Sequence, residues 1–278
     1  MILPPEILDL RHAGLLCTIG FAGGALGGLL GVGGGIVMIP SMIFVLGRPF
    51  GDNSLHVFKL ASLIASAAVS IPAAMRHLRS GAVIRPLVGR LIPAAVVGMA
   101  LGILLAQQLV GPQTKILQAA FGGVMIAAAI VNLWQTRKSA DDSQAATIGA
   151  VPYRSWSAIL LTGAPAGALA GLFGIGGGIW AVPILHFIYH VRIRNAIATS
   201  SCLIVFISVL TAITQSAAVS SISGLRATDG WWLALAMAPG AALGGWCGAL
   251  LTHVLPTGIL RRVFMAFLAI AGLRMMMA

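Results

Sequence analysis

The sequence predicts an all-α membrane protein built from two inverted repeats. Each repeat is a glycine-broken helical hairpin followed by three transmembrane helices, which gives eight to ten membrane segments. Charged residues make up only 8% of the 278-residue chain, hydrophobic residues make up 59%, and the mean hydropathy is +1.00. The apolar runs are about 20 residues long, the length that crosses a bilayer. A glycine-rich block in the first half also returns in the second.

The repeated block sets the organisation of the chain. Residues 31–36 read Gly-Val-Gly-Gly-Gly-Ile, and residues 174–179, 143 positions later, read Gly-Ile-Gly-Gly-Gly-Ile. The same separation relates Gly20, Gly24, Gly28 and Pro40 to Gly163, Gly167, Gly171 and Pro183. Apolar segments interrupted at equivalent glycines in two halves are typical of secondary transporters, whose half-helices meet near the bilayer midplane. We therefore expect one site shared by both halves.

The first half, residues 1–134, begins with an overlong apolar segment from Ala13 to Leu46. As one helix it would extend about 50 Å, against a hydrocarbon core of about 30 Å. Glycine disfavours helix by about 1 kcal/mol per residue, so we expect the break at Gly33–Gly35. Unwound backbone at that depth must line protein or a water-filled cavity. Three ordinary spans are expected next: Leu55 to Met75, Leu87 to Leu109, and Ile116 to Trp134.

The second half repeats this plan after a polar linker at residues 135–155. It covers residues 156–278 and opens with the overlong segment from Ala158 to Tyr189. The spans expected after it are Ala196 to Val219, Trp231 to Leu255, and Ile259 to Met275.

Loop charges favour an antiparallel relation between the halves, because parallel repeats would give equivalent loops similar basic content. The loop between the first two ordinary spans is strongly basic only in the first half, and the loop after the glycine-broken segment only in the second. For the loop between the first two ordinary spans, the first half has Arg76, Arg79, Arg85 and Arg90, and the second half has Arg226 with Asp229. For the loop after the glycine-broken segment, the first half has Arg48 with Asp52, and the second half has Arg192 and Arg194. If each glycine-broken segment is a hairpin, the basic loops predict that both termini lie outside a bacterial cytoplasmic membrane. Eight unbroken spans with both termini inside are the alternative.

Several classes of function are disfavoured. The formal charge of +11 resides at segment ends and in loops, where membrane topology explains it without nucleic acid. Three separate cysteines, Cys17, Cys202 and Cys247, have no metal-ligand spacing, and neither glycine run continues as a phosphate-binding loop. We expect no metal and no cofactor. The sequence contains no His-Glu-x-x-His motif and no Ser/His pairing on neighbouring helices, so it does not indicate an enzyme.

The glycine runs are the candidate substrate site. A break leaves backbone N–H groups free at the start of the following half-helix, where the dipole is also positive, and such ends bind anions. We assign this role to Gly33, Gly34 and Gly35 and to Gly176, Gly177 and Gly178. The alternative is that glycines only allow close helix contact. For Gly20, Gly24, Gly28 and their repeats, we favour that packing role.

Polar residues at the head of the next span complete the candidate site. They are Lys59 and Ser62 in the first half, and Thr199 and Ser200 in the second. Hydroxyls can bind oxyanions, yet in membrane helices they also bond backbone carbonyls. Lys59 is either a counter-charge for substrate or an interfacial side chain. All acidic residues fall in termini, loops or the linker, which favours an anionic over a cationic substrate.

With these residues in view, the chain resembles the sulfite exporter TauE/SafE family of membrane transporters. The resemblance rests on Gly-x-x-x-Gly-x-Gly-Gly-Gly-x-x-x-x-Pro from Gly27 to Pro40, on its repeat from Ala170 to Pro183, and on Ala198-Thr199-Ser200. It implies movement of sulfite, sulfonates or related sulfur anions. Lys59-Leu60-Ala61-Ser62 departs from the commoner Thr-Ser signature.

We therefore expect a secondary transporter of a small sulfur-containing anion, working by alternating access as the two halves rock. A passive anion channel and a transporter of another small organic anion remain alternatives. The expected partners are the small anionic substrate and the lipid bilayer, with no nucleic acid. A homo-oligomer is left open.

Overall fold

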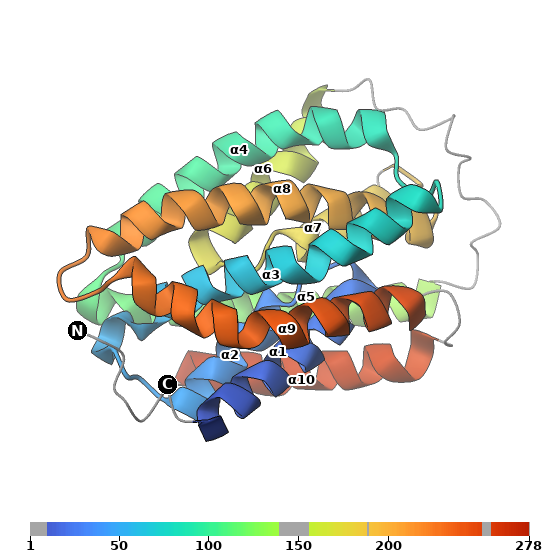
Figure 1. Ribbon diagram of the computed structural model, residues 1–278. Coiled ribbons are helices and arrows are strands. Elements are labelled where there is room, and N and C mark those ends of the chain that lie inside the picture. The colour runs from blue at the N-terminus through green and yellow to red at the C-terminus, as the bar shows by residue number, and fades with distance from the viewer. Residues whose placement is uncertain (1–9, 139–155, 188, 252–256, 278) are drawn as a thin grey trace.

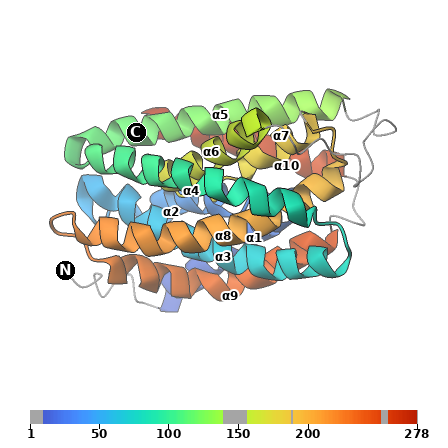
Figure 2. The same ribbon diagram turned by 90° about the horizontal axis from the view of Figure 1, so that it is seen from above.

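The computed structural model describes residues 10–138, 156–187, 189–251 and 257–277. Their helices run roughly along one long axis (Figures 1 and 2). In chain order they are α1 (Leu10–Leu30), α2 (Gly35–Leu46), η2 (Gly51–Asn53), α3 (Ser54–Arg79), α4 (Arg85–Gln108), η3 (Gly111–Gln113), α5 (Thr114–Lys138), α6 (Trp156–Phe173), α7 (Gly178–Phe187), α8 (Ile193–Ser220), α9 (Ala227–Leu251) and α10 (Thr257–Met277). Six of these helical stretches are long and apolar enough to cross a membrane. The protein is an all-α, multi-pass membrane protein.

Both overlong segments break at their glycines, as predicted. Helix α1 ends at Leu30 and α2 begins at Gly35, while α6 ends at Phe173 and α7 begins at Gly178. Each short helix then folds back along its predecessor, since Met38 of α2 contacts Gly23 of α1. The α1–α2 hairpin opens toward the end of the molecule at which α10 ends, and the α6–α7 hairpin opens toward the other end (Figure 1).

The six ordinary spans lie close to where the sequence placed them, with helices that extend a few residues beyond the expected limits at several ends. The expected end of the span from Trp231, at Leu255, lies outside the described residues. Helix α5 continues to Lys138, so the first four residues of the predicted linker are helical. The rest of that linker, residues 139–155, lies outside the described residues.

The first helix of each half packs on the other half. Backbone atoms of α9 lie against the glycine stripe of α1, and backbone atoms of α4 lie against the equivalent stripe of α6. The contacts pair Gly20, Gly24 and Gly28 with Met237, Ala241 and Gly245, and Gly163, Gly167 and Gly171 with Leu91, Ala95 and Met99. These glycines serve close helix packing, as expected. The halves are interleaved rather than adjacent.

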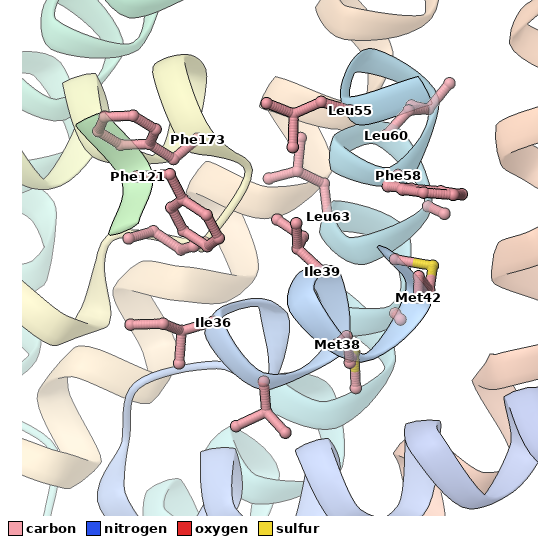
Figure 3. Packing of buried hydrophobic residues seen from close by; sticks show 14 of the residues in the cluster. Ile36, Met38, Ile39, Met42, Leu55, Phe58, Leu60, Leu63, Phe121 and Phe173 are labelled. Carbon is pink, nitrogen blue, oxygen red and sulfur yellow. The ribbon is translucent and has the colours of Figure 1, made fainter. Parts of the chain in front are cut away.

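Apolar side chains fill the space around the first hairpin. Figure 3 shows Ile39 of α2 beside Leu63 of α3, and Phe121 of α5 beside Phe173 at the end of α6. The Phe121 and Phe173 ring centroids are 5.6 Å apart. All four residues are buried. This packing fixes the position of α2 relative to α3, and hence the position of the first break.

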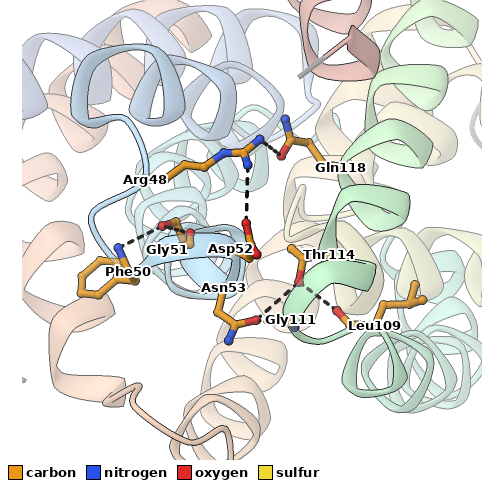
Figure 4. Close-up of polar contacts among 10 residues, drawn as sticks. Arg48, Phe50, Gly51, Asp52, Asn53, Leu109, Gly111, Thr114 and Gln118 are labelled. Atoms are coloured by element: carbon orange, nitrogen blue, oxygen red, sulfur yellow. Dashed lines mark hydrogen bonds and ion pairs between the residues drawn. The ribbon is translucent and has the colours of Figure 1, made fainter.

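Polar contacts join two connections between helices (Figure 4). Arg48 lies 3.7 Å from a carboxylate oxygen of Asp52, and its Nη2 donates to Gln118 of α5. The Gly111 amide donates to the side-chain oxygen of Asn53 at 2.8 Å. The α2–α3 and α4–α5 connections are therefore held together.

Candidate functional site

The two glycine breaks lie against each other. A Cβ built on Gly35 would stand 2.7 Å from the Gly174 carbonyl oxygen, and one built on Gly178 would stand 2.5 Å from the Gly31 carbonyl oxygen. Each short helix therefore starts against the first glycine of the opposite break. No side chain fits between backbones this close. The sequence predicted this meeting of the two breaks.

Positive φ angles explain why glycine is needed in both breaks. Gly31 and Gly33 have φ of +66° and +78°, and the equivalent Gly174 and Gly176 have φ of +76° and +72°. For other L-residues such a left-handed conformation is unfavourable by about 1–2 kcal/mol. The breaks differ at one position, because Gly177 has φ of +78° whereas Gly34 has φ of −63°.

Several backbone N–H groups in the breaks donate to no acceptor among the described residues. They belong to Gly33 and Gly34 before α2, and to Gly176, Gly177 and Gly178 before and at the start of α7. Residues 31–35 and 174–178 are also buried. Unpaired, buried donors at the positive ends of two helices favour a negatively charged ligand.

One serine links each break to the long helix of the other half. Ser62 of α3 donates to the Gly174 carbonyl at 2.8 Å, and Ser200 of α8 donates to the Gly31 carbonyl at 2.9 Å. Both serines are fully buried. They therefore lie at the junction of the breaks as predicted, with their protons directed to backbone carbonyls.

Thr199, also predicted for the site, has a different neighbour. Its hydroxyl accepts a hydrogen bond from the Ile84 amide at 3.2 Å. Asn195, one turn earlier, donates to the Ala82 carbonyl at 2.9 Å. Thr199 and Asn195 thus hold the α3–α4 connection against α8, and the structure does not bring the Thr199 hydroxyl to the glycines.

Lys59 is a charged residue whose backbone lies against the second break. Its side chain is fully buried, its Cα and Cβ lie against Gly174, and its ammonium has no hydrogen-bond partner in the described chain. An interfacial position for the Lys59 side chain was one of the two alternatives from the sequence. The structure does not support it, because the ammonium is fully buried and does not reach the surface. His56, one turn earlier, is buried too and contacts the Leu109 carbonyl through Nε2 at 3.1 Å.

The opposite face of the junction is apolar at the equivalent positions. Gly31 lies against Ile197 of α8 as Gly174 lies against Lys59 of α3. A cavity of about 20 Å³ adjoins this side, lined in part by Val32, Ile179 and Ile197. That volume admits about one water molecule. This cavity is too small for an oxyanion, so the helices must separate to admit one there.

One expectation about acidic residues was wrong. Asp229 was placed in a loop, yet it lies in the first turn of α9 and is buried. The next residue, Gly230, packs on the side chain of Leu60, which brings this turn beside the start of α3. Tertiary packing of α9 on α3 buries a residue that composition alone assigns to the surface.

Two buried serines at the junction were missed. Ser66 accepts a hydrogen bond from the Gly35 amide at 3.1 Å. The Ser208 hydroxyl has no partner among the described residues, and a Cβ built on Gly176 would stand 3.2 Å from it. Their spacing was a usable signal, since Ser66 follows Ser62 by one helical turn and Ser208 follows Ser200 by about two.

The motif and the geometry agree with a comparison to known proteins. The family description "Sulfite exporter TauE/SafE" matches residues 16–275, nearly the whole chain. This chain belongs to the TauE/SafE family. The resemblance inferred from the doubled glycine motif is therefore confirmed. No solved structure matches the chain.

Individual relatives carry transporter names. A "Probable membrane transporter protein" of Xylella fastidiosa is 30% identical, over 90% of each chain. "Probable membrane transporter protein YunE" of Bacillus subtilis is 25% identical, over 93% of this chain and 95% of its own. "Probable membrane transporter protein MamO" of Magnetospirillum gryphiswaldense is 26% identical over 98% of this chain, which spans only 45% of that relative. These names and the family support membrane transport.

Proposed function

We propose that the chain is a secondary transporter of a small sulfur-containing anion, bound where the two glycine breaks meet. The observation that carries the proposal is the fully buried side chain of Lys59, whose ammonium has no hydrogen-bond partner in the described chain and whose Cα and Cβ lie against Gly174. A buried charge inside a membrane is unfavourable unless a counter-charge accompanies it. An anion supplies that charge, and the free amides of the breaks supply hydrogen-bond donors.

The family description favours sulfite or a related sulfur anion as substrate. The residues named for this role are Gly33, Gly34, Gly35, Gly176, Gly177, Gly178, Lys59, Ser62 and Ser200, with Ser66 and Ser208 added by the geometry. We do not assign substrate contact to the Thr199 hydroxyl, because it accepts a hydrogen bond from the Ile84 amide. Another small organic anion is the second candidate, since an ammonium and backbone amides recognise charge and oxygen rather than sulfur.

We expect alternating access, and the interleaved helices indicate which parts would move. Because α1 packs on α9 and α6 on α4, the two sequence halves are not separate bodies. The bodies that we expect to rock are α1, α2, α3 and α9 against α4, α6, α7 and α8. They meet along α3 and α8, where Ser62 and Ser200 each bond the opposite break. In an inverted repeat, the bond from Ser62 in one state would correspond to the bond from Ser200 in the opposite state.

Basic connections set the proposed orientation. Helices α3 and α7 end, and α4 and α8 begin, at the end of the molecule opposite to the start of α1 and the end of α10 (Figure 1). Arg79 is the last residue of α3 and Arg192 directly precedes α8, so both arginines lie at this end. Loops rich in Lys and Arg favour the cytoplasmic side of a membrane. We place this end in the cytoplasm of a bacterial cell and both chain termini outside.

Flux in proteoliposomes tests the proposal. Purified protein is reconstituted, and uptake of radiolabelled sulfite, thiosulfate and a sulfonate is measured with Lys59→Met beside the unchanged protein. We expect the variant to fold and to lose about tenfold or more in apparent anion affinity, equivalent to about 1.4 kcal/mol. Lys115→Met is the matched control, because Lys115 is exposed on α5 and far along the sequence from either break.

Unchanged affinity in a folded Lys59→Met protein contradicts the proposed site. A channel is distinguished by counterflow, since unlabelled substrate on the far side accelerates uptake through a carrier and not through an open pore. Acceleration by sulfite alone would assign the sulfur anion, and acceleration by any small carboxylate would assign the wider class.

A further inference from the structure

A groove separate from the glycine junction lies between the end of α3 and the outer face of α9. It has a volume of about 640 Å³ and is lined by Pro72, Met75, Arg76, Arg79, Ser80 and Trp246. Met75 and Trp246 are 49% and 52% exposed. Two arginines, a hydroxyl and apolar side chains thus share one open groove on the surface of a membrane protein.

The two arginines lack a carboxylate partner in the groove. Arg76 and Arg79 lie three residues apart, which places them on one face of α3, and the lining contains no Asp or Glu. Asp52, which pairs with Arg48, lies in the α2–α3 connection, before the start of α3 and not at the end that carries Arg76 and Arg79. Two neighbouring guanidinium groups are suited to bind a phosphate through several N–H donors.

The polar and apolar parts of the groove lie at different depths. Gly245, next to Trp246, packs on the backbone of Val69. Arg76 lies seven residues beyond Val69 on α3, about 10 Å farther along the helix axis. Trp246 therefore stands closer to the bilayer centre than the arginines. The order from the end inward is charge and hydroxyl, then aromatic and aliphatic surface.

We propose that this groove binds an anionic glycerophospholipid, with the headgroup phosphate on Arg76 and Arg79 and an acyl chain along Met75, Pro72 and Trp246. A free phosphate ion would use the arginines but gain nothing from the exposed apolar lining. Arginines close to a lipid surface attract anionic headgroups, and aromatic rings favour the interface. The lipid would support the α3–α9 pair from outside, and the site is independent of the transported anion.

Native mass spectrometry of the full chain in detergent tests this site. Phosphatidylglycerol and phosphatidylcholine with identical acyl chains are titrated, and the ratio of their affinities is measured. An arginine near the membrane surface contributes about fivefold, so Arg76→Gln/Arg79→Gln is expected to lower the preference for phosphatidylglycerol about 25-fold. The control is Arg192→Gln/Arg194→Gln, which removes the same charge from exposed residues outside the groove. Its preference is expected to change less than twofold.

A second variant keeps the test decisive if the first is unstable. Trp246→Leu is expected to weaken both lipids about equally and to leave their affinity ratio within twofold. Equal loss of preference in the two double variants would indicate general surface charge and would overturn the site. So would retained preference in Arg76→Gln/Arg79→Gln, unchanged lipid affinity in Trp246→Leu, or complete displacement of phosphatidylglycerol by millimolar inorganic phosphate.

Discussion

The two faces of the glycine junction share a backbone plan but differ in chemistry. On α3, Lys59 lies against Gly174 and Ser66 lies against Gly35. At the equivalent positions of α8, Ile197 lies against Gly31, and Ile204 approaches Gly178. The serines between them are alike, since Ser62 and Ser200 each bond the opposite break.

This difference indicates which features serve the scaffold and which serve a ligand. Contacts present on both faces, such as the glycine backbones and the two serines, hold the breaks together. A charge present on one face only is not needed for that architecture, because Ile197 fills the same place without it. We therefore attribute the scaffold to the repeated residues and ligand selection to Lys59.

The largest expected effect comes from the shared backbone contact. Gly31→Ala and Gly174→Ala each place a methyl group about 3 Å from backbone atoms of α8 or α3, at glycines with positive φ. Left-handed strain of about 1–2 kcal/mol and overpacking of a similar size should destabilise each variant by about 3 kcal/mol. Thermal unfolding in detergent measures the loss, which should be similar for the two variants.

Gly81→Ala is the matched control for these glycines. Gly81 has φ of +68° but nothing within 4 Å of an added methyl group. It should show the strain alone, about 1–2 kcal/mol. If one of the two breaks tolerates alanine as well as Gly81 does, the faces do not share a close backbone contact.

Moving the charge from one face to the other should give the next largest effect. Lys59→Ile is expected to weaken anion binding about tenfold, or about 1.4 kcal/mol. Adding Ile197→Lys places an ammonium beside the equivalent glycine, and we expect binding to recover to within about threefold of the unchanged protein. Equilibrium binding of labelled sulfite by both proteins checks this. A double variant as weak as Lys59→Ile would show that the site is built on the α3 face alone.

The smallest expected effect concerns the shared serines. Ser62→Ala and Ser200→Ala each remove one buried hydrogen bond to a glycine carbonyl, which contributes about 1 kcal/mol net. Unfolding should therefore shift by a similar amount in both proteins. A loss confined to Ser62→Ala would mean that the two links are not equivalent, and that the Ser62 contact with the Lys59 carbonyl matters more.

Most of the fold could be predicted because its signals are local. The length of the apolar segments and the helix-disfavouring glycines located both breaks, and helices α3 and α8 begin within a few residues of their predicted starts. The depth of Lys59 could not be predicted in this way. Its Cα and Cβ lie against Gly174 in the α6–α7 break of the other half, a contact that neither its sequence neighbours nor its position in the span reveals.

Helix pairing across the halves was also missed, although the sequence held a signal for it. Gly240, Gly244 and Gly248 form a second small-residue stripe on α9, and each packs on a backbone atom of α1. Two such stripes predict that two helices approach closely but not which two. The buried Asp229 was missed for the same reason, since only the docking of α9 on α3 covers it.

The pairing of α1 with α9 also constrains how the protein is made. Helix α1 is synthesised before α9, so its glycine stripe finds its partner only after residues 227–251 have been made. During that interval the stripe faces lipid or a temporary neighbour, and the first half cannot reach its final packing. The packing of α1 is therefore complete only once α9 has been synthesised, and a chain stopped before α9 would retain an unpaired glycine stripe that a second such chain could occupy.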